Sequence, residues 1–255
     1  MGKVVKNSLG YDSNLYVYQD KSMFNYSIDT ILLANFATLN TGTKRVLEVG
    51  TNNGALSIFL SERSSKLKID AIEIQEKALD LAIKNIELNK KENMINAFKA
   101  DFNEFAEDHA KNQKEKYDLI ICNPPFYKVD SYKKRKGDES IFIATHEVKL
   151  TLEQLIKKSA RIVKQKGYLT IVEPTERLVD IFVLMRQYGF EPKKVQFIHP
   201  REDKKSNLVL VEGRYHTGWG THYLPNLYLH TDDLSKHEYK DEVKELYKPK
   251  KVIGE

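Results

Sequence analysis

The stretch 118–126 constrains the fold more than any other part of the chain. Residues 119–122 are a short apolar run, which is typical of a strand buried in a parallel sheet. The next residues are Asn123, Pro124, Pro125 and Phe126, and the two prolines end the strand because neither can donate to a ladder. We therefore expect an amide and an aromatic ring at the carboxyl edge of a sheet, where open α/β folds bind ligands.

Short apolar runs alternate with helical patterns along most of the chain. Such alternation predicts βαβ units and therefore a parallel sheet with helices between its strands. Thr151 and Gln154 form a capping box at the start of one helix. Further helices are expected over 27–37, 75–89 and 175–188. Strands are expected over 46–49, 68–74, 95–100, 119–122, 167–173, 195–199 and 208–212.

A small-residue turn from Gly50 to Gly54 joins the first of these strands to a helix. Strand, glycine-bearing loop and helix N-terminus form a general cofactor cradle, because the backbone can approach a ligand and its N–H groups point inward. Asn52 stands where a central glycine would be expected, and asparagine tolerates left-handed backbone angles. Glu48 is expected beside the loop, where it could meet a positively charged group.

Two acidic residues near strand ends, Glu73 and Asp101, are candidate ligand contacts. Glu73 follows the glycine loop by about 20 residues, the spacing at which an acid reaches a nucleoside ribose. Asp101 and Phe102 could bind an adenine amine and cover its ring, although Asp101 could equally be the N-cap of the next helix. Asp29, near a helix start, would interact favourably with the helix dipole.

The Asn-Pro-Pro-Phe turn suits chemistry on an exocyclic amine. Such an amine is a poor nucleophile, because its lone pair is delocalised into the ring. The Asn123 side-chain oxygen and the Pro124 carbonyl could accept its two hydrogens and so aim the lone pair at an electrophile. Phe126 could stack on the ring. An ordinary Pro-Pro turn after a core strand is the alternative.

A basic stretch follows this turn. It could grip phosphates over the site, or it could be a solvated run of charge. Its candidate RNA-binding residues are Lys128, Lys133, Lys134, Arg135 and Lys136.

Composition adds only broad limits. A net charge of +5 permits a nucleic-acid partner without requiring one. The single Cys122 excludes an intrachain disulfide and fits a reducing compartment. Without an apolar leader or a membrane-spanning run, we expect a soluble, cytoplasmic protein. Residues 1–27 could form a short strand pair over the sheet or over the site, and 213–255 a tail that packs on the sheet.

The glycine loop, Glu73, Asp101 and the Asn-Pro-Pro-Phe turn, in this order, resemble class I S-adenosylmethionine-dependent methyltransferases that act on amines. A closer resemblance is to the bacterial tRNA adenine N6-methyltransferases that modify position 37 of valine tRNA. It rests on segments 26–34, 123–126, 144–147, 172–178 and 197–200.

The resemblance implies an α/β, Rossmann-like class I methyltransferase fold, with a seven-stranded, mostly parallel sheet and helices on both faces. Residues 1–255 would form a single domain, a monomer or weak dimer without metal, acting on tRNA. Asn123, Pro124, Pro125 and Phe126 would be catalytic. S-adenosylmethionine would contact Asp29, Glu48, Gly50, Asn53, Gly54, Glu73, Ile74, Asp101, Phe102 and Asn123.

Several alternatives remain open at this stage. Guanine N2-methyltransferases of ribosomal RNA share the catalytic turn. Protein glutamine N5-methyltransferases share it too, but they carry a sizeable helical domain before the glycine loop. In this sequence the loop begins at Gly50, so few residues precede it. A non-catalytic RNA-binding module on the same scaffold is the alternative outside enzymes.

Overall fold

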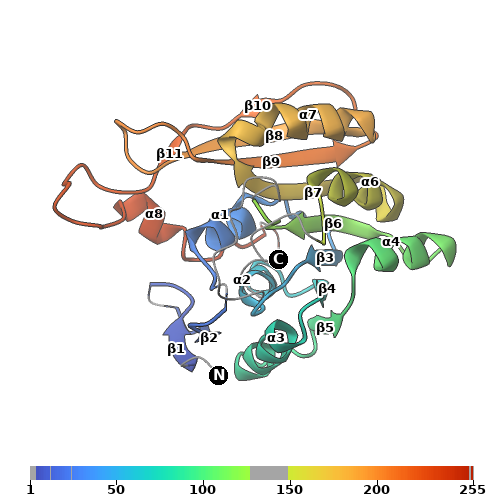
Figure 1. Cartoon of the computed structure of the whole chain (residues 1–255), viewed down its shortest axis with the longest axis horizontal. Coiled ribbons are helices and arrows are strands. Elements are labelled where there is room, and N and C mark those ends of the chain that lie inside the picture. The colour runs from blue at the N-terminus through green and yellow to red at the C-terminus, as the bar shows by residue number, and fades with distance from the viewer. Residues whose placement is uncertain (1–3, 12, 24, 127–148, 253, 255) are drawn as a thin grey trace.

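A twisted central sheet organises the computed structural model, which describes residues 4–11, 13–23, 25–126, 149–252 and 254 (Figure 1). Strand β3 (Arg45–Val49) pairs in parallel with β4 (Lys68–Glu73) and β6 (Tyr117–Cys122). Beyond them, β5 (Ile95–Lys99) extends one side and β7 (Val163–Pro174) the other, both in parallel. The carboxyl ends of these five strands therefore meet at one edge of the sheet.

The far side of the sheet changes direction. Strand β9 (Leu208–Tyr215) lies antiparallel between β7 and β8 (Phe190–His199). Two short strands, β10 (His222–Tyr223) and β11 (Leu227–Tyr228), then pair with β8 in parallel. The predicted mostly parallel sheet of seven strands is confirmed, and the two additional strands belong to the tail.

Helices cover both faces of the sheet, as predicted (Figure 1). One apolar core holds side chains of α1 (Ile28–Phe36), α2 (Ala55–Ser61) and α3 (Glu76–Leu88). The other holds side chains of α4 (Phe102–Lys111), α6 (Leu152–Ile162) and α7 (Leu178–Gln187). Along β6, Leu119 and Ile121 join the first core and Ile120 and Cys122 the second, which explains why the strand is apolar throughout.

Some predicted boundaries were wrong. Strand β7 begins at Val163, directly after α6, and not at Gly167. A Cβ at Gly167 would lie 2.8 Å from the Val163 side chain and 2.9 Å from the Asp118 carbonyl, so only glycine fits at this point of the strand. The helix predicted to begin at Thr175 starts instead with a 3-10 turn, Thr175–Arg177, before α7. Strand β8 begins at Phe190, well before the predicted 195.

The N-terminal residues form a separate two-stranded antiparallel sheet. Its strands are β1 (Val4–Ser8) and β2 (Tyr16–Asp20). The pair lies beside α3 and not on the central sheet (Figure 1).

The last segment of the tail returns to the first half of the chain. After α8 (Asp241–Glu245), the Asn35 side chain donates to the Leu246 carbonyl and accepts from the Lys250 amide at 3.0 Å. Buried Arg63 donates to the Lys250 carbonyl at 2.9 Å and to the Ala37 carbonyl at 2.7 Å. Its burial lowers the pKa of the guanidinium to about 10. Two polar side chains therefore hold 246–252 against α1 and α2.

Across the described ranges, every helix falls short of the length and hydrophobicity that crossing a membrane requires.

Candidate active site

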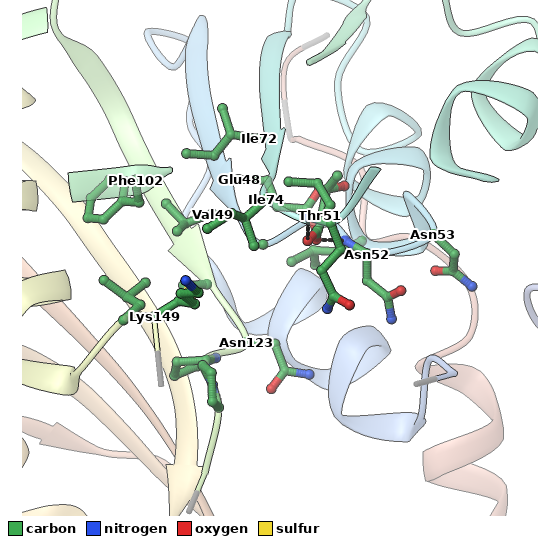
Figure 2. Close-up of a pocket in the computed structure, with 18 of the residues that line it drawn as sticks. Glu48, Val49, Thr51, Asn52, Asn53, Ile72, Ile74, Phe102, Asn123 and Lys149 are labelled. Atoms are coloured by element: carbon green, nitrogen blue, oxygen red, sulfur yellow. Dashed lines mark hydrogen bonds between the residues drawn. The ribbon is translucent and has the colours of Figure 1, made fainter. Parts of the chain in front are cut away.

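A cavity opens at the carboxyl edge of β3, β4 and β6 (Figure 2). It encloses about 1010 Å³ of empty space, part of it open to solvent, which is in the range of ligand-binding clefts. In Figure 2, Phe102 and Lys149 lie on one side, and Thr51 and Asn52 on the other. The cavity wall includes these predicted site residues: Glu48, Gly50, Asn53, Glu73, Ile74, Asp101, Phe102, Asn123, Pro124 and Pro125.

The glycine loop bends sharply between β3 and α2. Gly50 has a φ of 74°, Asn52 of 49° and Gly54 of 82°. The expectation that Asn52 adopts a left-handed conformation is therefore confirmed. Glycine is favoured at position 54 by this positive φ and not by crowding, since a Cβ there would meet Ala82 of α3 only at 3.4 Å, which is an ordinary contact distance. The Gly50 and Thr51 amides both donate to the Ile72 carbonyl, at 2.9 and 3.0 Å, which fixes the loop to β4.

Glu73 is held in place by backbone donors. Its two carboxylate oxygens accept from the Asn52 amide and the Gln75 amide, each at 2.9 Å. The side chain is only 6% exposed, and burial raises its pKa despite these bonds. Because the carboxylate is fixed in orientation at the cavity wall, it can accept hydrogen bonds from ligand hydroxyl groups without further ordering.

Glu48 lies deeper than predicted, since only 2% of it is exposed. It accepts hydrogen bonds from the Thr51 hydroxyl at 2.8 Å and from the Ser57 hydroxyl. Burial raises its pKa to about 7. No ion pair joins it to a cationic side chain among the described residues. A cationic group of a ligand at this end of the cavity would therefore find an acidic partner.

Asp101 is the N-cap of α4 and also lies at the cavity wall, so the structure is compatible with both alternatives that the sequence left open. Its Oδ1 accepts from the Asn103 amide at 2.7 Å and the Glu104 amide at 3.4 Å, so it is the N-cap of α4. It also lines the cavity, next to Phe102, which is 5% exposed. Because the cap uses Oδ1 alone, Oδ2 remains for an amine on a planar ring.

The turn after β6 forms another part of the cavity wall. Asn123, Pro124 and Pro125 line it, and Phe126 packs against the apolar core on the α1 face. Asn123 is half-buried, and its side chain makes no hydrogen bond within the described part of the chain. Its amide is therefore available to a substrate.

Three predicted residues do not contribute to the cavity wall. Gly54, Phe126 and Asp29 are not among the residues that line it. Asp29 accepts from the Ser27 hydroxyl at 2.8 Å, and burial raises its pKa. Its neighbours Tyr26 and Thr30 line the cavity instead. The predicted RNA-binding residues lie outside the described residues: Lys128, Lys133, Lys134, Arg135 and Lys136.

Other wall residues were not predicted. Thr51, Gln75 and Lys149 line the cavity, yet each is a common polar residue in a loop or at a helix start. Position alone could have identified Thr51, because it lies inside the glycine loop. Lys149 lies two residues before the N-cap Thr151, but nothing in its local sequence indicates that the chain before α6 reaches the cavity.

The donors and acceptors of the cavity fit a nucleoside with a cationic end. Glu73 offers fixed acceptors for a diol, Asp101 with Phe102 offers an acceptor beside a ring, and Glu48 offers a charge. The buried Nδ2 of Asn53 has no hydrogen-bond partner in the described structure. Within the same ranges, no group of three or more His, Cys, Asp or Glu residues could hold a metal ion.

Comparisons with known proteins agree with this arrangement. Residues 17–188 match the model of the methyltransferase small domain. A protein of Christiangramia forsetii, named tRNA1(Val) (adenine(37)-N6)-methyltransferase, is 28% identical over 89% of this chain and 91% of its own length. Proteins with the same name from Flavobacterium psychrophilum (28%, covering 76% and 81%) and Bacteroides thetaiotaomicron (33%, covering 63% and 64%) are also similar.

Solved structures support the fold alone, because their sequence identities are low. A predicted O-methyltransferase of Agrobacterium tumefaciens superposes with a TM-score of 0.67 at 18% identity, covering 88% of this chain and 97% of the other. M. jannaschii TYW2 in complex with AdoMet superposes with a TM-score of 0.53 at 13% identity, covering 84% and 87%. The predicted Rossmann-like class I methyltransferase fold is confirmed.

Proposed function

The chain belongs to the methyltransferase small domain family, and on that premise we propose that it methylates the exocyclic N6 of an adenine in tRNA. The adenine at position 37 of valine tRNA is the proposed target, in keeping with the names of the similar bacterial proteins. The observation that carries the proposal is structural. Asn123 and Pro124 of the catalytic turn line the same cavity as Glu73 and Asp101.

S-adenosylmethionine is the proposed cofactor, and it supplies an electrophilic methyl group when bound. Glu73 would hold the ribose hydroxyls, and Asp101 with Phe102 would hold the adenine. The glycine loop and Asn53 would hold the amino-acid part, with Glu48 as a negative charge at that end. All of these residues except Gly54 of the loop line the cavity, which supports the assignment.

The role proposed for Asn123 follows from the hydrogen-bond acceptors of the turn. Its side-chain oxygen and the Pro124 carbonyl would accept the two hydrogens of the target amine and orient its lone pair. Phe126 is half-buried against the apolar core beside this turn, and the part of its ring that stays exposed would stack on the flipped base. A nucleotide in an anticodon loop is unstacked at little cost, which suits such a pocket. The methylated amine would lose its proton to water, so no strong general base is required.

We further propose that residues 1–255 act as one domain, a monomer or weak dimer in the cytoplasm, where tRNA is the partner. The predicted basic residues of 128–136 would contact tRNA phosphates.

The decisive experiment is methyl transfer from labelled S-adenosylmethionine to total tRNA that lacks this modification, with identification of the labelled nucleoside. We expect N6-methyladenosine in one valine tRNA, and no product with the Asn123→Ala protein as control. N2-methylguanosine, or label found only in ribosomal RNA or protein, would assign the activity to one of the related methyltransferase classes. Failure to bind S-adenosylmethionine would leave only an RNA-binding role.

A further inference from the structure

Asn85 of α3 and Asn89, the C-cap of this helix, bind the N-terminal strand pair as a neighbouring strand would. The Asn85 side chain accepts from the Tyr18 amide at 2.6 Å and donates to the Tyr18 carbonyl at 3.0 Å. The Asn89 side chain does the same with Tyr16, at 3.0 and 2.7 Å. Four helical residues and two strand residues both span about 6 Å, so the two pairs are in register.

Asn85 also reaches the glycine loop, and Asn89 does not. The Asn85 Nδ2 donates to the Asn53 carbonyl at 2.8 Å as well as to the Tyr18 carbonyl. An amide nitrogen carries two hydrogens, and Asn85 is 0% exposed, so water cannot replace either partner. Both hydrogens of this buried amide are therefore satisfied only when the strand pair and the loop are in place together.

Asn53 is the loop residue that connects this amide to the cavity. Its side chain is 2% exposed and lines the cavity wall, and its Nδ2 has no partner in the described structure. Holding the Asn53 carbonyl fixes the peptide that carries this side chain. The orientation of the unpaired donor is thus set from α3, outside the cavity.

A second link joins the strand pair to another residue of the wall. The Tyr26 hydroxyl donates to the Ser8 carbonyl of β1 at 2.9 Å, and the Tyr26 amide donates to the buried Gln19 side chain of β2 at 3.1 Å. Tyr26 itself lines the cavity. The strand pair therefore supports the cavity at two separate points.

We propose that Asn85 is a positioning residue that couples the N-terminal strand pair to the cofactor-binding loop. This inference rests on the proposed function, because it assumes that the cavity binds S-adenosylmethionine. The coupling is reciprocal: a strand pair in place favours the bound geometry of Asn53, and a bound cofactor favours a docked strand pair.

The test compares Asn85→Ala with Asn89→Ala. Each substitution removes two hydrogen bonds to β2, but only the first also releases the Asn53 carbonyl. We expect Asn85→Ala to raise the dissociation constant and the KM of S-adenosylmethionine about tenfold, with kcat little changed, and Asn89→Ala to leave them near wild type. Equal effects of the two substitutions would overturn the coupling.

A measurement on the unmodified protein covers the case in which Asn85→Ala does not fold. Hydrogen exchange is followed at the Tyr18 and Tyr16 amides with and without S-adenosylmethionine. We expect slower exchange with cofactor at Tyr18, with a smaller change at Tyr16, which serves as the internal control. The same change at both amides, or at neither, would overturn the inference. If the unmodified protein binds no S-adenosylmethionine, the proposed function fails and the inference fails with it; if it binds and methylates tRNA, only the coupling is in question.

Discussion

Replacing Glu48 by glutamine should make the protein without cofactor more stable at alkaline pH. The carboxyl group has an ordinary pKa of 4.5, and burial raises it to about 7 in the folded chain. The folded state therefore holds the proton more tightly than the unfolded chain between these values. The stabilisation from this group is fully present below pH 4.5, and it is lost as the pH rises to about 7. Glutamine keeps an oxygen to accept from Thr51 and Ser57 but does not titrate.

The magnitude follows from the difference between the two pKa values. A difference of about 2.5 units corresponds to about 3 kcal/mol in total, of which about 2 to 3 kcal/mol falls between pH 5 and pH 8. That is a large part of the stability of a typical domain. We expect the unfolding free energy of wild type to fall relative to Glu48→Gln by this amount across that range.

Urea denaturation of both proteins at several pH values measures this difference. Glu73 and Asp29 also have raised pKa values, but they are present in both proteins, so their contributions largely cancel in the difference. Parallel stability curves between pH 5 and pH 8 would refute the argument. The stabilisation that S-adenosylmethionine confers on the folded protein gives a second readout, because its cationic end should favour the ionised Glu48 carboxylate. Its stabilisation of wild type should therefore be greater at pH 8 than at pH 6, and this difference should vanish in Glu48→Gln.

Three further predictions concern the turn, the N-cap and the basic stretch. Asn123→Ala should lower turnover at least about 100-fold while cofactor binding stays largely in place, and near-normal turnover would refute the proposed mechanism. Asp101→Ala should lower the unfolding free energy by about 1 kcal/mol because the N-cap is lost, whereas Asp101→Asn keeps the cap. Calorimetric titration should show weaker cofactor binding by both variants. Normal cofactor binding by Asp101→Asn would mean that this residue serves only as a cap. Neutralising the basic stretch should weaken tRNA binding and lower the slope of log affinity against log salt concentration by about 0.7 to 0.9 per lost phosphate contact. An unchanged slope would identify a solvated run of charge. The residues to replace are Lys133, Lys134, Arg135 and Lys136.

The fold was predictable where local pattern and tertiary position agree. Buried parallel strands are apolar on both faces, so β3, β4 and β6 stand out in the sequence. Strand β8 does not, because polar and apolar residues mix in its first half, where it lies near the edge of the sheet. The early start of β7 was missed for a similar reason, since the Lys-Gln-Lys sequence before Gly167 does not resemble a buried strand.

The acidic residues of the candidate site could be predicted from the sequence, but their placement could be predicted only in part. Glu73 is the last residue of β4 and Asp101 comes two residues after the end of β5, so topology alone brings them to the carboxyl edge. Asp29 was expected at the cavity, but successive helical residues are rotated by about 100°, and Thr30 faces it instead. The depth of Glu48 depends on Thr51 and Ser57 closing over it, which no periodicity shows.

The attachment of the tail has a consequence for synthesis on the ribosome. Asn35 and the Lys250 amide that it binds are 215 residues apart, and Arg63 and the Lys250 carbonyl are 187 apart. Translation adds about 5 to 20 residues per second, so the first half of the chain exists for many seconds before these partners emerge. In that interval a guanidinium and an amide that are buried in the finished molecule must remain hydrated, and the α1–α2 region cannot close. Completion of this region is therefore a late event of folding, set by the arrival of 246–252 and not by the helices themselves.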